Sequence, residues 1–291
     1  MLIIMIAIYK REIKSYLKNA NGLIFTALVL FMIGIYTTVY NLYSGYSNFE
    51  YAVSGAVFGF IIAVPVFTMK SLAEDKKQKT DQLLYSLPIK VSMIVSGKLF
   101  AMFSLLAVPV LISCVYPVML NIFGNVDYKT AYTSLLGFYL LGASLITVGM
   151  FISSLTENQL IAAVLTIVSL IAMYWIDTLS ALIPTAAGTS VIITVVLCIL
   201  LGGLILYMSK NITTAAIVSA VGIAVVCVLC MIDITVFEGF AQKMLLCIDM
   251  FGRLDNFIYS LFDLTGILYY LSVIFVFAFL SIQSLEKKRW C

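Results

Sequence analysis

The sequence predicts an all-α integral membrane protein with about eight transmembrane helices and both termini in the cytosol. Composition is the first reason: 63% of the 291 residues are hydrophobic and 11% are charged, whereas soluble domains are roughly 45–50% apolar and about 25% charged. The mean hydropathy of +1.12 is the second. The third is that the apolar residues form runs of the length that a helix needs to cross a bilayer core of about 30 Å.

Eight apolar runs set the predicted number of spans. None of them contains Asp, Glu, Lys or Arg, so all 17 basic and 14 acidic residues lie outside the runs. A β-barrel does not fit, because its strands need only about 9–11 residues and alternate in polarity. The predicted spans are Gly22–Tyr43, Tyr51–Met69, Leu99–Phe123, Ala131–Leu155, Leu160–Ile176, Thr189–Met208, Ile212–Ile232 and Leu264–Leu285.

The distribution of Lys and Arg predicts the orientation, because cytoplasmic segments of membrane proteins carry an excess of both. With the N-terminus in the cytosol, the inner segments hold 14 of the 17 basic residues, and only Lys129, Lys243 and Arg253 lie outside. In a helix over residues 1–21, the apolar residues would lie on one face and the cations on the opposite face, which favours an amphipathic helix in the cytosolic interface. The alternative is a simple basic flank to the first span.

Two long polar segments lie between the spans, at residues 70–98 and 233–263. In the inner segment, Leu83, Leu84 and Leu87 fall on one face of a short predicted helix that Pro88 ends. Such a helix could dock into a groove on a partner; equally, its lysines could hold a solvated loop against lipid headgroups. The outer segment is too polar to span and rich in aromatic residues, so we expect interfacial helices or a re-entrant hairpin.

The residue types exclude several kinds of chemistry. The chain has no histidine, which excludes Ser-His-Asp and Cys-His catalysis. The spans lack the charged groups that ion-coupled carriers place in the membrane. Gly97-Lys98 resembles the end of a phosphate-binding loop, but Leu99 stands where Ser or Thr is needed. We therefore predict no enzyme activity and no catalytic, metal or cofactor-binding residue, and any ATP would bind to another polypeptide.

Four segments carry a resemblance to a known family. They are the basic run Tyr9–Leu17, the stretch Glu74–Pro88 with its Leu-Leu and Leu-Pro pairs, the turn Ser154–Gln159 and the tail Asp263–Trp290. In this order they resemble the permease subunits of type-2 ABC transporters, in particular the gliding-motility-like branch.

Two positions depart from the pattern of that family. Lys79 stands where the family usually has Gly, and Gln82 stands where it usually has Glu. Because many members have six spans, residues 189–232 look like an added hairpin.

The resemblance implies the type-2 ABC exporter permease fold over residues 1–291, in a bacterial cell membrane. A second copy or a related permease would complete a dimer, a separate ATPase would bind ATP and Mg²⁺, and no nucleic acid would take part. Thr156, Glu157 and Asn158 would form a second cytosolic turn near the ATPase. The ATPase-coupling residues would be Glu74, Asp75, Lys76, Lys77, Thr80, Asp81, Leu83, Leu84, Leu87 and Pro88.

Within that scheme the three leucines would fill a groove on the ATPase, and the charged residues would set the register of docking and the electrostatics of encounter. Two other functional classes stay open. One is an ion-coupled carrier or channel that works without an ATPase, and the other is a membrane assembly factor that transports nothing. No residue of the sequence selects a substrate.

Overall fold

The computed structural model describes residues 2–18, 20–77, 90–122, 124–196, 237–259 and 263–290, and within these ranges the regular secondary structure is entirely helical. The chain divides into two compact units. Unit 1 comprises Met1–Ala172 and Met250–Cys291, and unit 2 comprises Met173–Asp249. The all-α prediction is therefore confirmed for the part of the chain that the structure describes.

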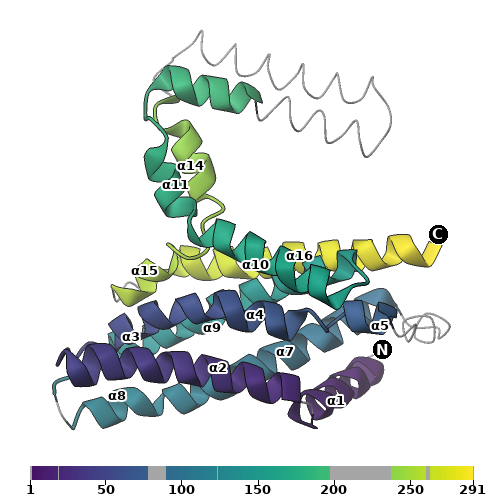
Figure 1. The fold of residues 1–291 in the computed structure, drawn as a ribbon, viewed down its shortest axis with the longest axis horizontal. Helices are drawn as coiled ribbons and strands as arrows, with labels where there is room; N and C mark the ends of the chain where they lie inside the picture. The colour runs from purple at the N-terminus through teal and green to yellow at the C-terminus, as the bar shows by residue number, and fades with distance from the viewer. Residues whose placement is uncertain are drawn as a thin grey trace. The chain divides into compact units, whose positions relative to one another are not determined.

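The helices of unit 1 come from two stretches of the chain, which unit 2 separates in sequence (Figure 1). They are α1 (Leu2–Lys18), α2 (Ala20–Tyr36) with its π-helical extension η1 (Thr37–Tyr43), α3 (Phe49–Ala56), η2 (Val57–Gly59), α4 (Phe60–Thr68), α5 (Ala73–Lys77), α7 (Val91–Ser113), α8 (Val115–Leu120), α9 (Tyr128–Leu155), α15 (Leu254–Ile258) and α16 (Leu264–Trp290). Helix α10 (Gln159–Tyr174) ends in unit 2, which also holds α11 (Ile176–Leu182), Ala187–Val196 and α14 (Phe240–Leu246).

Five helical stretches are long and apolar enough to cross a membrane. They are Ala20–Tyr43, Phe49–Lys77, Val91–Leu120, Tyr128–Leu155 and Leu264–Lys287. Helices α10 and α11 provide a sixth only if they count as one span that breaks at Trp175. Five to six apolar helices are compatible with a multi-pass membrane protein. Of the eight predicted spans, Ile212–Ile232 and the part of Thr189–Met208 beyond Val196 lie outside the described residues.

Helix α9 forms the centre of unit 1, where small residues allow other helices to approach it closely. A Cβ atom added to Gly142 would lie 2.7 Å from Cζ of Phe60, and one added to Gly137 would lie 2.8 Å from the Phe257 side chain. The tilted rings of Phe60 and Phe138 pack between α4 and α9 with their centroids 4.4 Å apart. This is the close packing through small residues that helices in lipid use, because the hydrophobic effect does not drive their association there.

The outer polar segment, for which the sequence predicts interfacial helices or a re-entrant hairpin, contributes to both units. In the outer segment 233–263, α14 belongs to unit 2, whereas α15 belongs to unit 1 and packs against α9. Phe257 of α15 is fully buried, and the nearby Tyr270 hydroxyl donates to the Met250 carbonyl at 2.8 Å. Residues 250–259 of this segment therefore contribute to the helical core of unit 1.

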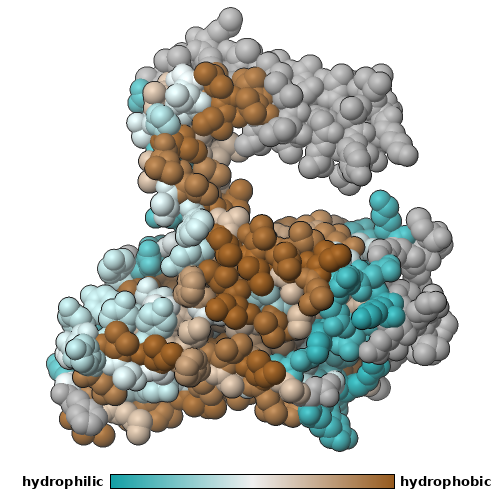
Figure 2. All heavy atoms as spheres, in the orientation of Figure 1, coloured by the Kyte–Doolittle hydropathy of each residue, from teal (hydrophilic) through white to brown (hydrophobic). Residues whose placement is uncertain are grey.

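One end of unit 1 carries most of the basic residues that the structure describes in this unit. Helix α1, helix α5 and the C-terminal end of α16 lie at this end (Figure 1), and Ser284 of α16 donates to the Ser154 carbonyl of α9 at 3.3 Å. Figure 2 shows hydrophilic residues over this end and hydrophobic residues over the middle of the unit. The arrangement agrees with the prediction that residues 1–21, the segment 70–98 and the C-terminus share one side of the membrane.

We expect Gly142→Ala to destabilise the protein by about 1–3 kcal/mol, because the added methyl group forces Phe60 and Leu106 apart. Thermal unfolding of the purified protein in detergent measures the effect. Gly188→Ala is the matched control, since no atom lies within 4 Å of a Cβ at Gly188. Equal melting temperatures for the two variants would contradict the close packing of α9 on α4.

The far end of α9 offers a pH test. Asp127 caps this helix by accepting from the Thr130 hydroxyl at 2.6 Å and from the Lys129 amide at 3.1 Å. These hydrogen bonds, the Thr130 one foremost, lower the pKa of Asp127 below its ordinary value of 3.8. The pKa of Asp127 is lower in the folded state than in the unfolded state. The charged cap therefore stabilises the fold fully above the unfolded-state pKa, and this stabilisation is lost as the pH falls through the folded-state pKa.

We therefore expect Asp127→Ala to melt at a lower temperature than the native protein at pH 6, with the difference narrowing below pH 3.8. Melting temperatures of both proteins across this pH range provide the measurement. A difference that stays constant down to about one pH unit below the ordinary value would show that the charge of Asp127 contributes nothing.

Candidate functional site

The structure describes the first part of the predicted ATPase-coupling segment. Glu74, Asp75, Lys76 and Lys77 lie on α5, which continues the second apolar stretch beyond α4. The other predicted coupling residues, which include the leucines of the docking face, lie outside the described residues: Thr80, Asp81, Leu83, Leu84, Leu87 and Pro88.

Helix α5 is attached firmly to the end of α9. The amides of Leu72 and Ala73 donate to the Ser153 hydroxyl at 3.3 and 3.1 Å, and the Lys76 ammonium donates to the Ser154 carbonyl. Lys76 is therefore buried, with 8% of its surface exposed. The Lys76 ammonium satisfies a carbonyl at the end of α9, where the last helical turn leaves carbonyls without partners, and a role of Lys76 in ATPase coupling stays a prediction. Lys77 is the exposed cation of this helix.

The second predicted turn caps a helix. Asn158 accepts from the Leu160 amide at 2.9 Å, and the Thr156 hydroxyl donates to the Asn158 carbonyl at 3.3 Å. Glu157 is exposed beside them. Capping accounts for Thr156 and Asn158, and Glu157 is the member of the turn that lies open to the surroundings.

A buried ionic cluster joins α1, α5 and α7. Lys98 is 4% exposed, although the sequence places it in a solvated loop. Its ammonium forms a salt bridge with the Asp75 carboxylate, lies 3.8 Å from Oε1 of Glu12 and donates to the Ser71 carbonyl at 2.6 Å. Helix α7 begins at Val91 rather than at Leu99, so Lys98 lies inside a helix and the predicted loop is shorter.

The cluster holds its helices together because a buried charge that loses its partners lowers the stability of the fold strongly. Removing one member of a buried ion pair costs about 3–5 kcal/mol, since the other charge then stays buried without compensation. Lys98 serves two carboxylates whose side chains are 21% and 11% exposed, those of Asp75 and Glu12. Displacing α5 from α7 would therefore leave charges without partners on both helices.

A polar cavity of about 310 Å³ adjoins this cluster. Its walls carry three basic and three acidic residues, together with the hydroxyls of Tyr16 and Ser71, and neither of these two buried hydroxyl oxygens has a hydrogen-bond partner. Burial raises the pKa of Tyr16, and the charges of Glu12 and Asp75 raise it further, so this hydroxyl stays protonated. The charged lining residues are Arg11, Lys70, Lys98, Glu12, Glu74 and Asp75.

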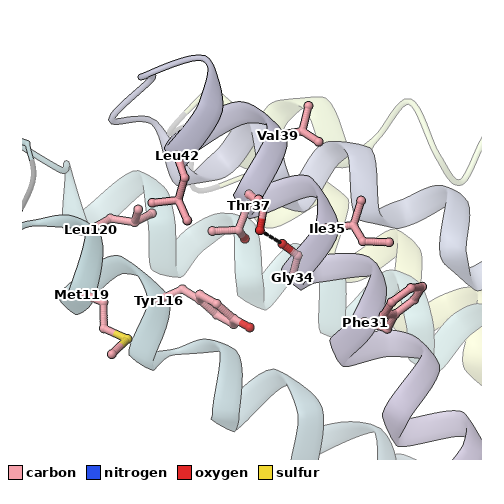
Figure 3. A pocket seen from close by; sticks show the side chains of 10 residues that line it. Phe31, Gly34, Ile35, Thr37, Val39, Leu42, Tyr116, Met119 and Leu120 are labelled. Atoms are coloured by element: carbon pink, nitrogen blue, oxygen red, sulfur yellow. Dashed lines mark hydrogen bonds between the residues drawn. The ribbon is translucent and has the colours of Figure 1, made fainter.

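A second cavity, of about 670 Å³, is apolar and lies between η1 with the end of α2 on one side and α8 on the other (Figure 3). The Thr37 and Thr38 hydroxyls donate to their own helix, to the carbonyls of Ile33 and Gly34 at 2.7 and 2.8 Å. Few polar groups remain to meet a ligand, so the cavity suits a lipophilic one. The sequence did not predict this cavity, because it depends on the π-helical turn of η1.

The described residues contain no group of three or more His, Cys, Asp and Glu side chains that could hold a metal ion. No family model matches the chain, and no curated protein or solved structure matches it significantly. The resemblance to type-2 ABC transporter permeases therefore stays a prediction.

We expect Lys98→Met to lower the free energy of unfolding by about 3–5 kcal/mol, because Glu12 and Asp75 lose their shared cation. Adding Glu12→Gln and Asp75→Asn should restore part of the loss by removing the uncompensated charges. Thermal unfolding in detergent measures both effects, and Lys14→Met, at an exposed position of α1, is the control. Stability equal to that of the control would show that the cluster does not hold the helices together.

Proposed function

We propose that this chain is the membrane-spanning permease subunit of an ATP-driven exporter. A separate ATPase would bind to the end of unit 1 that holds α1, α5 and the C-terminal end of α16, and would drive transport from there. The observation that supports the proposal most is the attachment of α5. This short helix leads into the predicted docking segment, and it is bound to α9 through Lys76 and to α7 and α1 through Asp75 and Lys98.

The attachments of α5 suit the transmission of force. An ATPase seated on Leu83, Leu84 and Leu87 would close after it binds ATP and Mg²⁺, and the movement would reach α5 along the chain. Buried polar contacts connect α5 to α9, α7 and α1, so these helices would move together with α5. The movement would then not be absorbed by a flexible connection. The exposed Lys77 and Glu157 would steer the encounter with the ATPase.

A dimer belongs to the same proposal. Helix α10 exposes large apolar side chains, among them Leu160 at 73%, Ile161 and Val164. Helix α16 exposes Phe275 at 74%. Lipid covers such faces in a membrane protein, and a second permease could cover one of them.

An ion-coupled carrier is the second candidate function, and the burial of Lys98 is the observation that favours it. Charged groups inside membrane helices mark ion pathways in many carriers, and the apparent lack of such groups argued against this class. Lys98 with its two carboxylates weakens that argument.

We expect the double variant Leu83→Asp and Leu84→Asp to insert in the membrane normally and to lose co-purification with the ATPase, because two carboxylates cannot enter an apolar groove. Pull-down from native membranes with mass spectrometry of the captured proteins is the measurement. Gln82→Asp with Ser86→Asp is the matched control, since it adds the same charge on another face of the predicted helix.

Two results would contradict the proposal. One is an ATPase that still co-purifies with the leucine variant and hydrolyses ATP at the normal rate. The other is transport by the purified chain alone in liposomes under an ion gradient and without ATP, which would support the carrier.

A further inference from the structure

The polar cavity beside the ionic cluster has the features of a built binding site. It lies between helices α1, α2, α4, α5 and α7, and its lining includes Tyr16, Ser71 and Lys98. We propose that it holds the headgroup of an aminophospholipid, with a phosphate group at its exposed end and a primary ammonium group at its buried end. This inference does not rest on the proposed transport function.

Two buried hydroxyls without partners indicate that the cavity takes a ligand. Ser71 is 4% exposed, and its hydroxyl oxygen has no hydrogen-bond partner. The Tyr16 hydroxyl oxygen is also buried and has none. Buried polar side-chain atoms are nearly always hydrogen-bonded in folded proteins, so two exceptions in one cavity point to a polar group that fills the space between them.

The charges at the exposed end suit a phosphate group. Arg11 is exposed, and within the described part of the chain no ion pair engages it. Lys70 donates to the amide oxygen of Asn21 at 3.1 Å, which leaves its charge uncompensated. Arg11 and Lys70 both line the cavity, and a guanidinium and an ammonium are typical partners of a phosphate, which an arginine can bind through two parallel hydrogen bonds.

The charges at the buried end suit an ammonium group. Lys98 is shared between Glu12 and Asp75, so this end holds one cation and two carboxylates. A primary ammonium can donate to a carboxylate and to the two hydroxyls that lack partners. A free inorganic phosphate would instead face both carboxylates with the same sign of charge, and a trimethylammonium group could donate no hydrogen bond.

The place of the cavity fits a lipid headgroup rather than a soluble metabolite. It lies where α2 begins and α4 ends, and α1 beside it carries the cations Lys10 and Lys14 on its exposed surface. Figure 2 shows that the hydrophobic middle of unit 1 gives way to hydrophilic residues toward the end that holds α1 and α5. Headgroups occupy this level in a membrane, and polybasic segments attract them.

The test uses the full-length protein, purified in detergent and depleted of lipid. Dioctanoyl phosphatidylethanolamine, phosphatidylcholine, phosphatidylglycerol and inorganic phosphate are titrated separately, and melting temperature and native mass spectrometry record binding. We expect phosphatidylethanolamine to bind most tightly. Arg11→Gln should weaken its affinity about tenfold, the usual effect of losing a hydrogen bond to a charged group, whereas the control Lys14→Gln should not.

Tyr16→Phe and Ser71→Ala give a sharper test, because each removes a hydroxyl that has no partner. Without lipid, these variants should melt at or above the temperature of the native protein. With phosphatidylethanolamine, both should show a smaller increase in melting temperature than the native protein. A structural role for the hydroxyls would instead lower the melting temperature without lipid.

Three results would overturn the proposal. Equal binding of all three lipids, unchanged in the variants, would indicate a non-specific detergent-like effect. An equal response to inorganic phosphate would assign the site to a free anion, and no response to any ligand would leave a cavity filled with water. If the protein binds the headgroup but no ATPase, the proposed transport function is wrong and the lipid site stands.

Discussion

The salt bridge between Lys98 and Asp75, with Glu12 beside it, is the interaction on which the architecture of one end of the molecule depends. Lys98 belongs to α7, Asp75 to α5 and Glu12 to α1, so one ammonium group fixes three helices that are distant in sequence. A buried ammonium needs its partners in place, since its desolvation costs several kcal/mol. Helix α1 packs along α7, where Tyr9 and Ser104 share a hydrogen bond of 2.9 Å.

The rest of unit 1 depends on packing rather than charge. Glycines of α9 allow the aromatic side chains of α4 and α15 to lie against its backbone, and α5 is bound to the C-terminal end of the same helix through Ser153 and Ser154. Helix α9 thus contacts α4 and α15 along its length and α5 at its C-terminal end. Movement of α5 would reach the core through α9 as well as through α7.

Hydropathy predicts the helices well, because a run of about 20 apolar residues has few other stable forms in lipid. The five described apolar helices follow from it, whereas the predicted common location of α1, α5 and the end of α16 follows from the distribution of Lys and Arg. The burial of Lys98 escaped sequence reasoning because one lysine at the edge of an apolar run looks like a loop boundary. Its signal was the largely apolar stretch from Val91, which continues through Lys98 without Pro, Asn or Asp. The cavity at η1 depends on a local change of helix type, which hydropathy does not encode.

The depth of the cluster favours a mechanical role over ion transport. Helical residues rise about 1.5 Å each, so the stretch from Lys98 to Leu120 is about 33 Å long and by itself matches the hydrocarbon thickness of roughly 30 Å. Lys98 therefore lies at the edge of the apolar layer, whereas the substrate and ion sites of carriers lie near its middle. A charge at this edge can meet headgroups and a partner in the cytosol. The buried cluster consequently fits an attachment point for the α5 segment better than a site through which ions pass.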